Sequence, residues 1–92
     1  MMYPYITLND DTLITHSHLI EKDDEQIVKI HFERPKDGGF DMARCVLPSY
    51  EWIIKEGYTE KEIAEFENMI KQGEHIFYKY AAIGGMEVAK AI

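Results

Sequence analysis

The chain has 92 residues, of which 46% are hydrophobic and 29% charged, and its 17 acidic and 10 basic residues give a formal net charge of −7. This balance excludes a largely disordered chain, and the acidic surplus argues against direct binding of nucleic acid or of a membrane surface, both of which require basic patches. The length fits a single domain, residues 1–92, with one thin core.

The first half of the chain predicts four antiparallel strands within residues 3–47. Short runs of β-branched and apolar residues alternate with polar clusters at 9–11 and 22–25. The strongest turn signal lies at 35–39, where proline, aspartate and two glycines follow one another. Short strands joined by tight turns are typical of an antiparallel meander.

The register of the second and third strands decides which side chains share a face. A two-residue turn at positions 23 and 24 would place Lys22 opposite Glu25, a favourable charge pair across the turn. In that register His18 lies opposite Lys29 and His16 lies opposite His31. An odd-numbered loop would move His31 away from the other two histidines.

The second half predicts helices over residues 49–56 and 60–83. Ser49 is a candidate cap for the short helix, and Thr59 with Glu62 has the spacing of a capping box for the long one. A straight helix of about 24 residues would run ~36 Å, longer than the strands, so we expect it to be intact or kinked at Gly73. The predicted fold class is therefore α+β, a four-stranded meander covered on one face by a C-terminal helical region.

Three histidines form the sharpest candidate for a metal site. In the favoured register His16, His18 and His31 lie on one face of two neighbouring strands, where three imidazoles would suit Zn²⁺ or Ni²⁺. The alternative is that they are ordinary polar residues on a solvent-facing side of the sheet. No other cofactor is expected.

Cys45 is the only cysteine, which excludes an intramolecular disulfide and fits a reducing cytoplasm. It lies inside a predicted strand without an activating motif, so we expect a small buried hydrophobe and not a nucleophile. The two glycine pairs lack the flanking residues of a phosphate-binding loop. The longest apolar runs are far shorter than the ~20 residues that span a bilayer. We therefore expect neither an enzyme nor a membrane protein.

Aromatic residues make up 12% of the chain, more than one helix on one sheet can easily bury. Aromatic side chains are common anchors in protein interfaces. The alternative is a core that the C-terminal tail completes by folding back. The candidate interface residues are Tyr3, Tyr5, Tyr78, Tyr80, Met86 and Val88.

These features favour a small acidic protein–protein interaction or regulatory module of the cytoplasm, with another protein or a second copy as its partner, most simply in a homodimer. Two alternatives are a transition-metal-binding protein and an inhibitor that mimics nucleic acid. The net charge is −4 in residues 1–48 and −3 in residues 49–92. This even spread is typical of solubilising charge and not of a concentrated acidic field.

Overall fold

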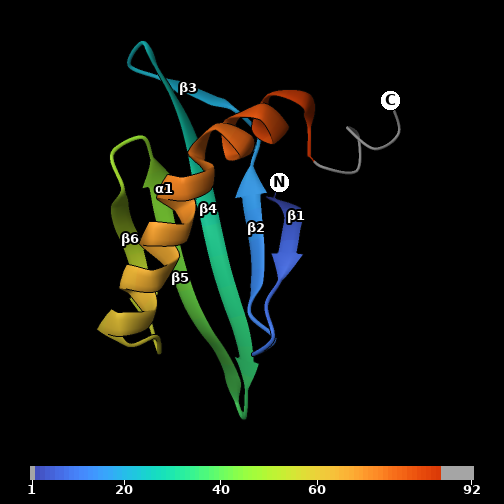
Figure 1. Ribbon diagram of the computed structural model, residues 1–92, viewed down its shortest axis with the longest axis vertical. Coiled ribbons are helices and arrows are strands. Elements are labelled where there is room, and N and C mark those ends of the chain that lie inside the picture. The colour runs from blue at the N-terminus through green and yellow to red at the C-terminus, as the bar shows by residue number, and fades with distance from the viewer. Residues whose placement is uncertain (1, 86–92) are drawn as a thin grey trace.

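Alternating apolar residues in the first half of the chain form an antiparallel sheet, and the helical pattern that follows forms one long helix on it (Figure 1). The computed structural model describes residues 2–85. The predicted α+β class is confirmed, with six strands in place of four. The elements are β1 (Met2–Thr7), β2 (Leu13–Ser17), β3 (Ile20–Lys22), β4 (Glu25–Lys36), β5 (Gly39–Leu47), β6 (Glu51–Glu56) and α1 (Glu60–Ile83).

Every pair of neighbouring strands in the sheet is antiparallel, in the order β1-β2-β4-β5-β6, and β3 pairs with β4 beyond the end of β2. Asp23 and Asp24 form a two-residue turn with φ values of 51° and 63°, and Lys22 lies opposite Glu25 as predicted. Positive φ at both central residues matches the twist of a tight hairpin. The long β4–β5 hairpin forms the centre of the sheet.

Residues 51–56 form the edge strand β6, so the helix predicted over 49–56 is wrong. Trp52 lies opposite Cys45 and Ile54 lies opposite Arg44, with Ile53 as an extra residue between them, so these two half-buried side chains point to opposite faces of the sheet. Ser49 closes a turn instead of capping a helix: its hydroxyl donates to the Val46 carbonyl at 3.2 Å and accepts from the Glu51 amide at 3.3 Å. Pairing with β5 outweighs the local helical signal.

The long helix α1 begins and ends as predicted. Thr59 caps it through the expected capping box with Glu62, and Gly84 ends it in a left-handed conformation with φ 88°. Gly73 has non-helical φ and ψ of −123° and 21°, which confirms a kinked helix. The kink divides α1 into two arms that run in different directions across the sheet (Figure 1).

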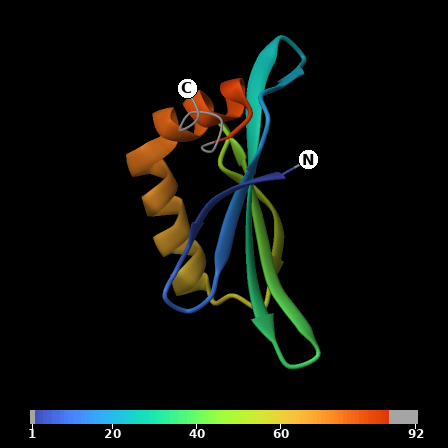
Figure 2. The same cartoon turned by 90° about the vertical axis from the view of Figure 1, so that its right-hand side faces the viewer.

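The core lies between α1 and one face of the sheet. Phe66, on the first arm, stacks on Phe32 of β4 with ring centroids 4.2 Å apart. Phe77, on the second arm, packs against Tyr5 of β1 at 4.4 Å. Each arm therefore covers a different half of the sheet, which resolves the length mismatch. Within residues 2–85 nothing covers the opposite face (Figure 2).

Candidate functional site

A one-residue bulge between β2 and β3 separates the three histidines. His16 lies opposite Ile30 and Ile20 lies opposite Ile27, so residues 17–19 on one side span only 28–29 on the other. The predicted pairing of His16 with His31 is therefore wrong, because the extra residue shifts the register by one and reverses the face of every residue in β2. His31 lies opposite Thr15 instead. In the part of the chain that the structure describes, no three His, Cys, Asp or Glu side chains are grouped to hold a metal ion.

His16 is fully buried on the face that α1 covers. Its Nδ1–H donates to the Ser17 carbonyl at 2.8 Å, and its ring lies between Tyr3 and Phe77 at centroid distances of 5.7 and 6.2 Å. Nε2 has no hydrogen-bond partner among the described residues. Burial lowers the pKa of His16 because a charged ring would lose its hydration. The neutral ring is thus part of the core.

His31 lies at the centre of the uncovered face and orients an arginine. Arg44 of β5, directly opposite, donates through Nε to His31 Nδ1 at 3.2 Å. The other ring nitrogen, Nε2, donates to Glu33 at 3.4 Å. Since Nδ1 accepts from the guanidinium, Nε2 carries the ring proton. The two hydrogen bonds that link Glu33, His31 and Arg44 therefore fix the Nε edge of the Arg44 guanidinium. The two Nη groups of Arg44 have no ion pair with any described residue.

We call the uncovered side of the sheet the outer face. Directly opposite residues in an antiparallel ladder share a face, so its membership follows from the register. Arg44 is its central cation, and aliphatic side chains from four strands surround the histidine–arginine pair. The outer face consists of Pro4, Thr7, Leu13, Thr15, Ile20, Lys22, Glu25, Ile27, Lys29, His31, Glu33, Pro35, Phe40, Met42, Arg44, Val46, Glu51, Ile54 and Glu56.

A second arginine stands at the margin of the covered face. Arg34 forms ion pairs with Asp41 at 2.8 Å, Asp10 at 3.0 Å and Glu62 at 2.7 Å, and its guanidinium lies 4.6 Å from the centre of the Tyr58 ring. These acids come from the β1–β2 loop, from β5 and from the first turn of α1. Arg34 therefore joins three elements and is satisfied within the chain, in contrast to Arg44.

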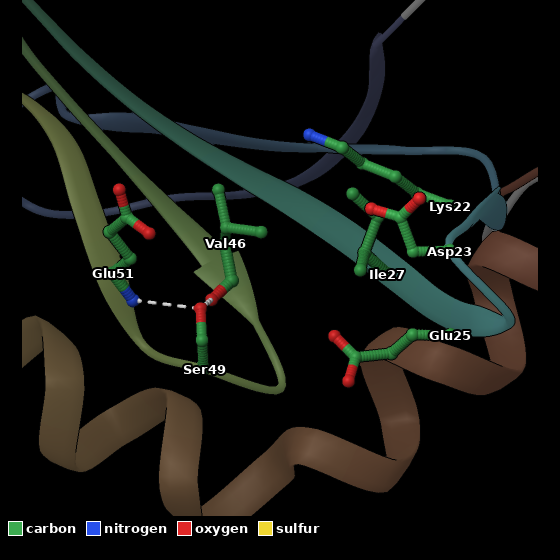
Figure 3. Close-up of a pocket in the computed structure, with 7 residues that line it drawn as sticks. All are labelled: Lys22, Asp23, Glu25, Ile27, Val46, Ser49 and Glu51. Atoms are coloured by element: carbon green, nitrogen blue, oxygen red, sulfur yellow. Dashed lines mark hydrogen bonds between the residues drawn. The ribbon is translucent and has the colours of Figure 1, made fainter.

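One hollow of about 300 Å³ opens at the end of the outer face, between the β3–β4 turn and the β5–β6 turn (Figure 3). Ile27 and Val46 provide its apolar part. Lys22, Asp23, Glu25, Ser49 and Glu51 provide its charged and polar rim. The three carboxylates point in different directions and do not converge on one point (Figure 3). The hollow extends the outer face and does not resemble an enclosed reaction site.

Cys45 is buried on the covered face. Burial, with a smaller contribution from the nearby Glu67 carboxylate, raises the pKa of its thiol to about 12. The reactive thiolate is therefore scarce near neutral pH. A buried protonated thiol packs as a small hydrophobe.

The tyrosines predicted at an interface make contacts within the chain. Tyr5 packs on Phe77, Tyr3 lies beside His16, and the Tyr78 hydroxyl donates to the Gln26 carbonyl at 3.0 Å. These three side chains and that of Tyr80 are half-buried. Met86 and Val88 lie outside the described residues. The tyrosines are thus engaged within the chain, whereas Arg44 has no ion pair among the described residues. The sequence patterns above do not single out Arg44.

The position of Arg44 was accessible from the sequence. The two-residue turn Asp37-Gly38 places Lys36 opposite Gly39, and counting outward from this pair puts Arg44 opposite His31. The sequence signal for this contact is thus the glycine-containing turn at 35–39 together with the regular register of the β4–β5 hairpin.

The sequence matches no protein-family model and no curated protein, and the fold matches no solved structure. No helix among residues 2–85 is long and apolar enough to cross a membrane.

Proposed function

We propose that this chain is a non-enzymatic protein–protein interaction module of the cytoplasm whose outer face binds another protein or a second copy. The observation that carries the proposal is Arg44: its guanidinium is fixed by His31, has no ion pair within the described residues, and is surrounded by aliphatic side chains. Arginine, methionine and aromatic side chains are enriched in protein interfaces, and the outer face presents Arg44 and Met42 side by side on β5.

The faces of the sheet suit a partner better than its edges do. The edge strand β1 has a bulge between Pro4 and Ile6, and Pro4 has no amide proton to donate. The other edge strand, β6, has a bulge at Ile53, where its pairing with β5 shifts. Bulges and prolines at sheet edges disfavour the addition of a strand. An open face flanked by irregular edges favours binding through side chains.

The state of the nucleophilic and titratable side chains in the sheet supports a binding role over catalysis. The thiol of Cys45 is buried and protonated, and the ring of His16 is enclosed in the core. The hollow in Figure 3 lies open on the outer face, with an aliphatic part that fits an apolar side chain of a partner. The free, buried cysteine is also in keeping with a reducing compartment.

Two charged substitutions on the outer face test the proposal. Leu13→Lys with Ile54→Lys places cations on both sides of the His31–Arg44 pair, and a matched control, Ile6→Lys with Ile83→Lys, changes two exposed apolar residues away from the outer face. Affinity capture from native extract, with sedimentation velocity of the purified chain, should show loss of bound protein or of self-association for the first variant alone. Identical capture and sedimentation for both variants and the wild type would contradict the proposal.

A further inference from the structure

The outer face holds six charged side chains that have no ion pair with any described residue. Lys22 and Glu25 lie opposite each other beside the β3–β4 turn, and the other four lie on β4, β5 and β6. Lys29 and Arg44 belong to the central strands β4 and β5. Glu51 and Glu56 belong to the edge strand β6. The ion pairs of the described chain instead involve Arg34, Lys36, His31 and Lys71. The unpaired bases Lys29 and Arg44 thus form a basic strip beside the acidic strip of Glu51 and Glu56, while Glu33 of β4 is paired with His31.

We infer that the outer face binds a second copy of this chain in a two-fold dimer. The inference rests on the proposed interaction function and names its partner. In a face-to-face pair that lays β5 of one copy over β6 of the other, the basic strip of each copy meets the acidic strip of its partner, and the symmetry makes the contact twice. The same surface is then its own complement, as a two-fold interface requires.

The surface is large enough for a stable dimer. The molecule measures 37 × 31 × 23 Å, and the sheet extends along the two longer dimensions (Figures 1 and 2). A typical specific interface buries ~800 Å² on each partner, about one-seventh of the 5859 Å² that this chain exposes. In this arrangement Met42, Val46 and Ile54, which lie on β5 and β6, provide the apolar area around the charges.

Two copies that each carry a net charge of −7 repel one another at long range. The dimer therefore depends on complementary charges at the interface itself. Arg44 is prepared for a carboxylate: His31 already holds its Nε, which leaves the two Nη groups in one orientation for a bidentate contact. An oriented guanidinium loses less conformational freedom on binding than a free one. His31 and Glu33 therefore act as positioning residues for Arg44.

Charge reversal of each strip tests the dimer. The base-reversed chain carries Lys29→Glu and Arg44→Glu, and the acid-reversed chain carries Glu51→Lys and Glu56→Lys. Each alone places like charges across both contacts, which should weaken self-association by roughly 100-fold or more. In an equimolar mixture every contact again joins an acid to a base, so the two variants should form a mixed dimer. Sedimentation equilibrium measures the dissociation constants of the wild-type dimer, of each reversed chain alone and of their equimolar mixture.

Lys61→Glu with Lys79→Glu is the matched control for the base-reversed chain, because it makes the same change of charge on exposed positions of α1. It should leave the dimer unchanged. Circular dichroism verifies folding, and if a reversed chain unfolds, Lys29→Gln with Arg44→Gln replaces it and should weaken the dimer by at least tenfold.

Three results would overturn the inference: a wild-type chain that remains monomeric at several hundred micromolar, reversed chains that still dimerise, or monomeric reversed chains that fail to associate when mixed. A monomeric wild type leaves the proposed function standing if Leu13→Lys with Ile54→Lys still abolishes capture of a different protein. Loss of both readouts would end both proposals.

Discussion

His16 and His31 lie on neighbouring strands of one sheet, but one belongs to the covered face and the other to the outer face. The covered face keeps His16 neutral and leaves its Nε2 without a partner, among residues that are almost all apolar. The outer face places His31 between a carboxylate and a guanidinium. A single extra residue in the bulge at 17–19 decides which environment His16 meets. Register, and not residue type, therefore decides which of the two histidines lies in the core and which lies on the outer face.

The largest expected effect comes from truncating a core ring on the covered face. Phe32 is fully buried and stacks on Phe66, so Phe32→Ala should lower the free energy of unfolding by about 3–5 kcal/mol. Met42→Ala, on the outer face of the adjoining strand, should cost about 1 kcal/mol or less. Urea denaturation of both variants measures the contrast. Equal losses would mean that something also covers the outer face in solution.

The two arginines provide the next contrast. Arg34→Met removes three charge-assisted contacts and should cost about 2 kcal/mol, whereas Arg44→Met should cost less than about 1 kcal/mol in the isolated chain. Urea unfolding at pH 7 measures both. A larger loss for Arg44→Met would show that the outer-face arginine stabilises the fold.

Acid should remove the stability that the ion pairs of Arg34 contribute. Lys36 and then Arg34 lower the pKa of Asp41 below 3.8, while the Thr59 amide and then Arg34 lower that of Glu62 below 4.5. A carboxylate with a lowered pKa stabilises the fold above its unfolded pKa, and that stability is lost as the pH falls through the folded value. The difference between wild type and Arg34→Met should therefore narrow between pH 5 and pH 2. A constant difference would show that Arg34 acts through packing alone.

A smaller effect should appear in the slope of the free energy of unfolding against pH. The unfolded chain protonates His16 near its ordinary pKa of 6.5, whereas the folded ring resists protonation, so wild-type stability should fall as the pH drops below about 6.5. His16→Leu should reduce this slope between pH 7 and pH 5 and change stability at pH 8 by about 1 kcal/mol or less. Cys45→Ala is the control: it creates a cavity but should leave the slope unchanged, because its thiol titrates near 12. An unchanged slope in His16→Leu would exclude His16 as its origin.

Local signals were sufficient for most of the fold. The capping box of Thr59 and Glu62, the left-handed Gly84 and the turns at 23–24 and 35–39 each depend on a few adjacent residues, so the sequence predicts them directly. Residues 49–56 were ambiguous because Ser49 suits a turn as well as a cap. Their strand conformation depends on pairing with β5, which lies outside the local window.

The candidate site was harder to predict because it depends on register. The turn at 23–24 predicts the correct pairing for β3, but no local pattern predicts the extra residue of the bulge at 17–19. All side chains of β2 therefore lie on the face opposite to the expected one. The Arg44–His31 contact depends on the other hairpin, where the register was regular and could have been counted.

The smallest expected effect concerns the turn that fixes β3 on β4. Asp24 has φ 63°, a left-handed conformation that glycine adopts at less cost, so Asp24→Gly should raise stability by about 0.5–1 kcal/mol. A thermal shift of a few degrees would report this gain, and Gly38→Ala, at φ 84° in the other hairpin, should lose a similar amount. Because the bulge and not this turn sets the face of His16, Asp24→Gly should keep the wild-type pH slope. A changed slope would mean that the turn and the bulge set the register of β2 together.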